Sequence, residues 1–207
     1  MPHPGLFIVL DGPEGSGKST QIARLRFRLE ATGRLVLPVR DPGSTRIGEQ
    51  IRSILLNPDH QEMAMRCEML LYMAARAQMM TEIIQPALNE GKIVLSDRFV
   101  SSTLAYQLGG DNLNSDEIRK VADIAIRHRW PDLTLLFDMP VEAAMSRVTR
   151  AKDRIEQRPM SYHDQVRKNY LAQAHADPHR HKVIDAARSP DEVEDQVWRA
   201  VSSLLSQ

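Results

Sequence analysis

Cysteine, aromatic residues and long apolar runs are all scarce in this chain of 207 residues. The single cysteine, Cys67, excludes a disulfide bond within the sequence and fits a reducing compartment. No apolar run approaches the roughly 20 residues that a membrane-spanning helix needs. The opening MPHPG lacks the basic and apolar regions of a signal peptide. We therefore expect a cytoplasmic protein that has no membrane partner.

An excess of one charge is also missing, because 27 Lys and Arg residues balance 27 Asp and Glu residues. Without a net positive charge the protein has no overall electrostatic field that would attract nucleic acid, so we expect no nucleic-acid partner. The length suits one domain with a full core, and we expect residues 1–207 to form it. Cys67 stands at helical spacing from Met63 and Leu70, which predicts a buried packing residue rather than a nucleophile.

Apolar runs alternate with helical periodicity along the chain. The runs predict strands over residues 6–10, 35–40, 92–97, 133–138 and 181–185. Helices are expected over residues 18–32, 45–57, 62–89 with a break or restart at Pro86, 101–107, 115–128, 141–152, 161–176 and from Pro190 onward. This alternation predicts a three-layer α/β fold whose central, mainly parallel five-stranded sheet is flanked by helices.

Residues 12–19, GPEGSGKS, match the phosphate-loop pattern G-x-x-x-x-G-K-[ST] at every fixed position. A strand before the loop and a helix after it are the context that this motif requires. Backbone N–H groups can surround phosphate oxygens, Lys18 can reach the β- and γ-phosphates, and Ser19 can hold Mg²⁺. The expected triphosphate site comprises Gly12, Pro13, Glu14, Gly15, Ser16, Gly17, Lys18, Ser19 and Thr20.

Charged residues follow other predicted strands at the edge where α/β sheets bind ligands. Asp97 ends the third strand, where a carboxylate can organise Mg²⁺; the alternative is a helix cap. Arg98 follows it, and a guanidinium can hold a phosphate through two parallel N–H bonds. The pair predicts a metal anchor beside an anion clamp, and hence two phosphate-bearing substrates.

Tyr72 and Arg76 are four residues apart in a predicted helix, so they share a face. They could stack on a base and donate to one of its oxygens. The alternative is a core tyrosine and a solvated arginine, and the spacing alone favours that alternative.

Arg147, Arg150 and Arg154 would form one stripe if residues 141–152 and their continuation were helical. Like charges on one helix face repel, so such a stripe favours an anion nearby. The alternative is a solvated face that acidic neighbours such as Asp153 and Glu156 neutralise.

Five segments together resemble the thymidylate kinases among the P-loop nucleoside monophosphate kinases. They are LDGPEGSGKST, RDPGST, LLYMAAR, DRFVSSTLAYQ and DRIEQ, which occur in that family's order from residue 6 to about residue 186. The phosphate loop is generic, whereas DRF-x-x-S-x-x-AYQ with DRIE is specific to the family. The resemblance implies Mg²⁺-dependent transfer of phosphate from ATP to dTMP by a homodimer. It also implies an acceptor-binding region at about 40–110 and a small helical lid at about 147–160.

The resemblance assigns roles to the acceptor site by position. Asp11 would help hold the sugar and order the magnesium-phosphate region, and Arg98 would clamp the dTMP phosphate with Arg52. The base and deoxyribose would lie among Tyr72, Arg76, Thr103, Tyr106 and Gln107, with Tyr72 stacking on thymine where phenylalanine is commoner in the family. Tyr106 would disfavour a 2′-hydroxyl.

The catalytic cations would be Lys18, Arg98 and an arginine of the lid among Arg147, Arg150 and Arg154. The loop carries Glu14 and no arginine, which resembles family members that supply the catalytic arginine from the lid. The segment RDPGST departs from the usual R-E-P-G-G-T. No general base is expected, since a phosphate oxygen is already anionic.

Two other functions stay open. One is a kinase for another nucleoside monophosphate or for a deoxynucleoside, against which Tyr72, Arg76 and Tyr106 argue. The other is a non-catalytic P-loop ATP-binding switch, which would need neither the anion clamp at Arg98 nor the lid arginines.

Overall fold

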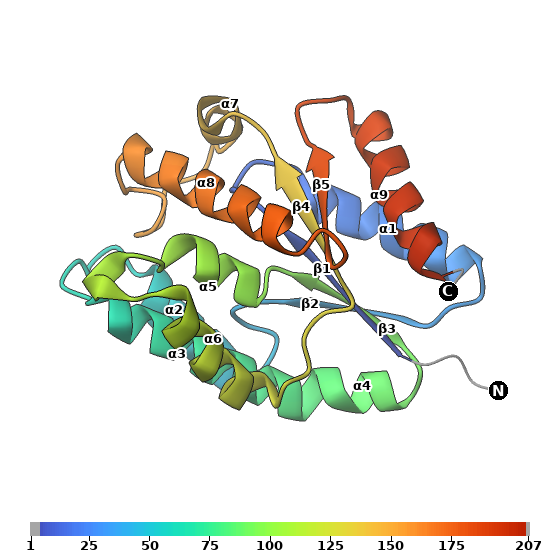
Figure 1. Ribbon diagram of the computed structural model, residues 1–207, viewed down its shortest axis with the longest axis horizontal. Coiled ribbons are helices and arrows are strands. Elements are labelled where there is room, and N and C mark those ends of the chain that lie inside the picture. The colour runs from blue at the N-terminus through green and yellow to red at the C-terminus, as the bar shows by residue number, and fades with distance from the viewer. Residues whose placement is uncertain (1–4, 206–207) are drawn as a thin grey trace.

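A five-stranded, all-parallel sheet forms the centre of the protein (Figure 1), as the sequence predicts. The computed structural model describes residues 5–205. The first four residues of MPHPG, in which we expect no signal peptide, lie outside that range. The strand order is β2-β3-β1-β4-β5. The strands are β1 Leu6–Asp11, β2 Val36–Arg40, β3 Ile93–Asp97, β4 Leu133–Asp138 and β5 His181–Asp185.

Helices connect the strands. They are α1 Lys18–Ala31, α2 Arg46–Leu56, α3 Met65–Met79, α4 Gln85–Asn89, α5 Val100–Tyr106, α6 Ser115–Ile126, α7 Val141–Ser146, α8 Met160–Ala176 and α9 Pro190–Leu205. A π-helical turn, Met80–Ile84, joins α3 to α4, so the predicted long helix is interrupted before Pro86 rather than at it. Between residues 5 and 205, none of the helices has the length and apolarity needed to cross a membrane.

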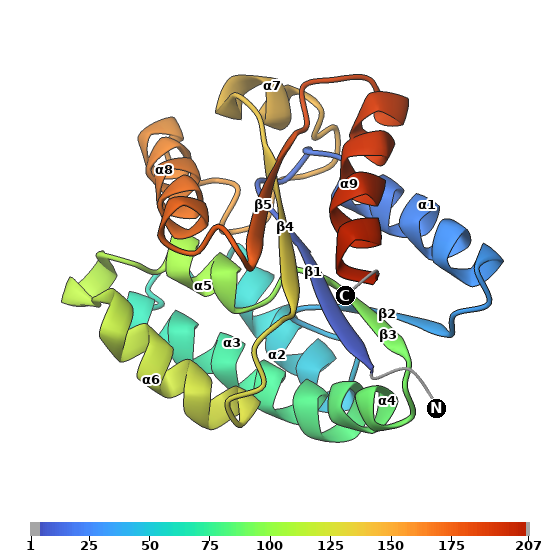
Figure 2. The same ribbon diagram turned by 45° about the vertical axis from the view of Figure 1, so that its right-hand side comes forward.

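The three central strands, β1, β3 and β4, are buried on both faces, as their apolar sequences require, whereas the edge strands β2 and β5 are partly exposed. In β1, Ile8 and Leu10 pack in a cluster with α1 and α9, whereas Phe7 and Val9 pack in another with α3, α5 and α6. Figure 2 shows α1 and α9 on one side of the strands, α2, α3, α5 and α6 on the other, and α7 above the strand ends. These two cores make the three layers of the fold.

Strand register places the polar strand ends together. Leu10 pairs with Asp97, which in turn lies opposite Arg40 on β2. The chain therefore leaves β1 and β3 at the same edge of the sheet, where Asp11, the last residue of β1, lies 3.5 Å from the guanidinium of Arg98, which follows β3.

Two local predictions are wrong. Cys67 is exposed, because α3 turns Met69 and Met73 into the core instead. The predicted helix over residues 141–152 ends at Ser146, and residues 147–159 form turns and irregular chain, so the three lid arginines make no helical stripe.

Candidate active site

The phosphate loop joins β1 to α1 through backbone that glycine alone adopts readily. Gly15 has φ 77°, and a Cβ there would lie 2.1 Å from the Ala144 carbonyl oxygen. α1 begins at Lys18, so its positive dipole end faces the loop. The Lys18 ammonium is buried and donates to the carbonyl oxygens of Gly12 and Pro13 at 3.1 and 2.7 Å. Burial, with a smaller effect of Arg98, lowers the pKa of Lys18 to about 8.

Ser19 and Asp97 meet beside the loop. The Ser19 hydroxyl lies 3.3 Å from Oδ2 of Asp97 at the end of β3. Mg²⁺ prefers oxygen ligands and usually takes few from the protein while keeping phosphate and water ligands. This hydroxyl and carboxylate fit such an ion. Within residues 5–205, His, Cys, Asp and Glu form no group of three that could hold a metal by itself.

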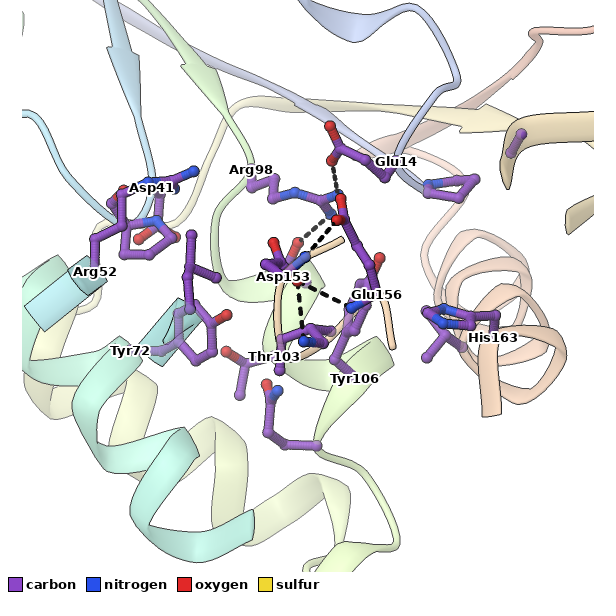
Figure 3. A pocket seen from close by; sticks show the side chains of 18 of the residues that line it. Glu14, Asp41, Arg52, Tyr72, Arg98, Thr103, Tyr106, Asp153, Glu156 and His163 are labelled. Carbon is purple, nitrogen blue, oxygen red and sulfur yellow. Dashed lines mark hydrogen bonds and ion pairs between the residues drawn. The ribbon is translucent and has the colours of Figure 1, made fainter. Parts of the chain in front are cut away.

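Arg98 lines a pocket together with Pro13 and Glu14 of the phosphate loop, and its backbone is in a left-handed conformation with φ 70°. Its N–H donates to the Leu10 carbonyl at 3.0 Å, which ties it to β1. Its guanidinium lies 3.2 Å from Glu14 of the loop (Figure 3). Burial alone would raise the pKa of Glu14, but Arg98, Lys18 and Arg150 lower it to about 2. Backbone strain in a residue of this kind is common at functional sites.

Asp11 lies beneath the pocket rather than in its wall. The carboxylate is fully buried and accepts hydrogen bonds from Ser101 and Ser102 of α5 and Tyr170 of α8 at 2.5 to 2.7 Å. It also lies 3.5 Å from Arg98. In this structure Asp11 therefore orders the start of α5 and the arginine. Sequence reasoning missed Tyr170 and the serine contacts, since nothing local relates α5 and α8 to β1.

The pocket next to Arg98 collects the predicted base-site residues. Its lining includes all six of Arg52, Tyr72, Arg76, Thr103, Tyr106 and Gln107. Figure 3 shows Tyr72, Thr103 and Tyr106 facing the same space. Burial raises the pKa of Tyr72, so its phenol is neutral. Four of these residues come from α3 and α5, and Gln107 directly follows α5. Arg52 comes from α2 and donates to the Pro42 carbonyl at 3.1 Å.

Arg76 is a buried polar side chain of the pocket that three residues hold by hydrogen bonds. Its Nε donates to Asp41 at 2.6 Å, and its two terminal nitrogens donate to Thr103 and to the Phe99 carbonyl at 2.7 and 2.8 Å. The guanidinium lies 5.7 Å from the Tyr72 ring centroid. The two residues thus share a face as predicted, while Arg76 is buried and paired rather than solvated.

The three lid arginines separate in space. Arg150 pairs with Glu156 at 2.7 Å and lies 3.6 Å from Glu14 of the phosphate loop. Arg154 is buried, donating to the Leu55 carbonyl and pairing with Glu68. Arg147 is exposed, with a terminal nitrogen 3.8 Å from the Met139 sulfur. Of the three, Arg150 lies beside the loop.

Sequence reasoning also missed Glu68 and His163. Glu68 stands four residues before Tyr72 on α3, so the helical period that related Tyr72 to Arg76 could have included it. His163 begins the second turn of α8 and lines the pocket; burial lowers its pKa. No spacing in the sequence connects His163 to the other pocket residues.

Comparison with known proteins agrees with this geometry. Residues 10–197 match the family model for thymidylate kinase. A thymidylate kinase of Nitratidesulfovibrio vulgaris is 43% identical over 210 residues, covering 97% of this chain and 98% of its own. Thymidylate kinases of Deinococcus radiodurans and Pseudomonas syringae pv. tomato are 43% and 44% identical, covering 96% and 97% of this chain and 97% of theirs. A match over nearly the whole length, with the phosphate loop and the Arg98 pocket both in place, shows that the chain belongs to the thymidylate kinase family.

Proposed function

We propose that this protein transfers the γ-phosphoryl group of ATP to dTMP, giving ADP and dTDP. The observation that carries the proposal is the place of Arg98. Its guanidinium touches Glu14 of the phosphate loop at 3.2 Å and also lines the pocket of Tyr72 and Gln107. The site of the phosphoryl donor and the site of the phosphoryl acceptor are therefore neighbours, and Arg98 contacts both.

The pocket suits a thymine nucleotide. Tyr72 offers a neutral aromatic face, Arg76 offers a fixed guanidinium, and Gln107 offers an amide. Tyr106 lies between this base site and Arg98, whose guanidinium is 5.4 Å from its ring centroid. The sugar would lie over Tyr106 and the phosphate at Arg98.

The reaction needs alignment more than proton transfer. A phosphate oxygen of dTMP forms a bond to the γ-phosphorus while the bond from that phosphorus to the β,γ-bridging oxygen breaks, and its electron pair stays on ADP. Lys18 and Arg98 hold the two phosphates from opposite sides. When bound, Mg²⁺ supplies positive charge at the β- and γ-phosphates, and Ser19 and Asp97 are the residues to hold it.

Arg150 is the arginine of the lid, residues about 147–160, that we assign to the transferring phosphoryl group. It lies 3.6 Å from Glu14, whereas Arg154 is anchored to Glu68 on the acceptor side. A transition-state arginine is typically worth about 10³–10⁵ in rate. Closure of the lid would also exclude water from the phosphates.

A homodimer is the expected assembly, and exposed apolar side chains support it. Ile47 and Ile54 of α2, Leu70 of α3 and Ile124 of α6 are 43%, 43%, 50% and 80% exposed. The three helices are neighbours, since α2 packs against α3 and α3 packs against α6. Light scattering during gel filtration should give twice the 23.5 kDa of one chain. We place the protein in the cytoplasm, since its single cysteine agrees with a reducing compartment.

The decisive experiment measures ADP release from Mg²⁺-ATP with a panel of acceptors. The panel contains dTMP, dUMP, dCMP, UMP, CMP and thymidine. We expect dTMP to give the highest kcat/KM. Faster turnover of UMP or CMP would contradict the acceptor, faster turnover of thymidine would indicate a nucleoside kinase, and ADP release independent of any acceptor would indicate an ATP-binding switch.

A further inference from the structure

Glu68 is a fully buried carboxylate directly behind the wall of the acceptor pocket. It lies on α3, one helical turn before Tyr72, and its exposed fraction is 0%. It is not part of the pocket lining, so it cannot touch an acceptor itself. A buried charge is costly unless it is paired and hydrogen-bonded, which makes its partners informative.

The two oxygens of Glu68 have different partners. Oε2 accepts from Arg154 and Arg158, both from the segment between α7 and α8, and the Arg158 bond is 2.7 Å. Oε1 accepts from Nε2 of Gln107 at 2.7 Å. Two guanidinium groups thus supply the positive charge that keeps the carboxylate in the interior, and the remaining oxygen holds an amide.

This arrangement fixes which way the Gln107 amide points. A carboxylate accepts hydrogen bonds and does not donate them, so the NH₂ group must face Glu68. The carbonyl oxygen, Oε1, then faces away from Glu68. It is buried in a residue that is 1% exposed, it has no partner among residues 5–205, and Gln107 lines the pocket. The pocket therefore presents a buried acceptor to the base.

A buried acceptor selects bases by their hydrogen-bonding edge. Thymine and uracil carry an N–H at N3, which can donate to Oε1 of Gln107, whereas N3 of cytosine is itself an acceptor. A base that leaves the oxygen unpaired is disfavoured, because a buried polar group without a partner is costly. If the Gln107 amide could rotate by half a turn, its NH₂ group would face the base instead and would donate to N3 of cytosine.

We propose that Glu68 is a positioning residue for base selection: by holding the Gln107 amide in one orientation, it makes the pocket prefer a base with N3–H. The inference rests on the proposed function, because it takes dTMP as the molecule that accepts the phosphoryl group. It also relates base selection to the lid segment, since Arg154 and Arg158 balance the charge of the carboxylate that orients Gln107.

The test is Glu68→Gln, which keeps the shape of the side chain. The new amide can present either its oxygen or its NH₂ group to Gln107, so it no longer fixes the orientation of the Gln107 amide. Steady-state kcat/KM is measured for dTMP, dUMP and dCMP. We expect the dTMP-to-dCMP ratio to fall at least tenfold. The dTMP-to-dUMP ratio should stay within twofold, since both bases carry N3–H and differ by a methyl group. A general loosening of the pocket would change both ratios and would contradict the proposal.

A double-mutant cycle separates action through Gln107 from other effects. Gln107→Met removes the acceptor, and in that background Glu68→Gln should leave the dTMP-to-dCMP ratio unchanged within twofold. A further fall there would show that Glu68 acts by another route. Glu30→Gln is the matched control, because it removes a carboxylate paired with Arg26 on the exposed side of α1; it should change neither ratio.

Circular dichroism and thermal unfolding show whether each variant is folded. If Glu68→Gln is unfolded, Glu68→Asp decides, because it retains the charge for the arginines and withdraws the oxygen from Gln107. Its dTMP-to-dCMP ratio should fall as well, and an unchanged ratio would overturn the proposal. Failure to form ADP with dTMP in the unsubstituted protein would contradict the proposed function, whereas normal activity with an unchanged ratio in the Glu68 variants would contradict only the role of Glu68.

Discussion

Replacement of Arg98 by alanine should separate the two substrates. The Arg98 side chain is 18% exposed and lies where the acceptor phosphate would bind, in the wall of the pocket beside Glu14. Each charge-assisted hydrogen bond that it donates to a phosphate is worth about 1.5–3 kcal/mol. Because the site is open to water, we take the lower value for two bonds, which gives about 3 kcal/mol, or roughly 150-fold in dTMP affinity.

The effect on ATP should be much smaller. Arg98 meets the donor side through Glu14, whose side chain is 41% exposed. Exposed ion pairs contribute about 0–1 kcal/mol, which corresponds to no more than roughly fivefold in ATP affinity. The two affinities should therefore change by factors that differ about thirtyfold.

Isothermal titration with dTMP and with ATP measures both affinities in the same preparation. Arg98→Lys keeps the charge but cannot form two parallel bonds, so its dTMP affinity should lie between those of Arg98→Ala and the unsubstituted protein. Arg40→Ala is the control, since Arg40 pairs with Glu49 at 3.0 Å outside the pocket. Equal losses of dTMP and ATP affinity in Arg98→Ala would refute the claim that Arg98 binds the acceptor and contributes little to ATP binding.

Three further predictions concern the lid, pH and the core. Arg150→Ala should lower kcat about 10³-fold or more while Arg147→Ala changes it little, and the reverse order in a steady-state assay would contradict the assignment of Arg150. His163→Phe should reduce the pH dependence of stability: burial lowers the pKa of His163 from 6.5, so the unfolded chain binds the proton first and the free energy of unfolding falls as the pH falls through 6.5 toward the folded-state pKa. Urea unfolding at neutral and mildly acidic pH checks this, and an unchanged slope would count against it. Phe7→Ala, at a residue 0% exposed, should cost about 3–5 kcal/mol of unfolding free energy, whereas Phe27→Ala, at one 74% exposed, should stay within about 0.5 kcal/mol.

The sequence predicted the elements whose pattern is local. The runs at 133–138 and 181–185 are strands with the predicted bounds, and Pro190 opens α9. The central strand β4 is buried on both faces and is a continuous apolar run, whereas the edge strand β5 buries only Ile184 and is bounded by its own short apolar centre. A proline fits the first turn of a helix, so neither prediction depends on distant residues.

Prediction failed at the arginines of residues 147–159, because no helical spacing relates them to the carboxylates with which they pair. Residues 147–159 have a helical charge pattern, yet Arg150 pairs with Glu156 and Arg154 with Glu68. A helix would align the arginines and repel them, whereas the irregular chain sends each to its own carboxylate.

The phase of α3 was misjudged for a related reason. Its buried face includes Glu68 and Arg76, both of which hydropathy would place outside. The hydropathy pattern therefore predicts a buried Cys67, whereas α3 builds its core face from other residues and leaves Cys67 exposed.

The balance of charges over the whole chain hides a concentrated field at the site. Burial raises the pKa of Glu14, but Arg98 at 3.2 Å and Arg150 at 3.6 Å, together with the charge of Lys18, lower it to about 2. One carboxylate of the phosphate loop thus pairs with two arginines and feels a third cation. Phosphate oxygens carry the same charge as that carboxylate and form shorter, stronger hydrogen bonds with arginine than neutral acceptors do. The cations are consequently held in place before any substrate arrives, and a protein with net charge +0 can still bind two polyanions.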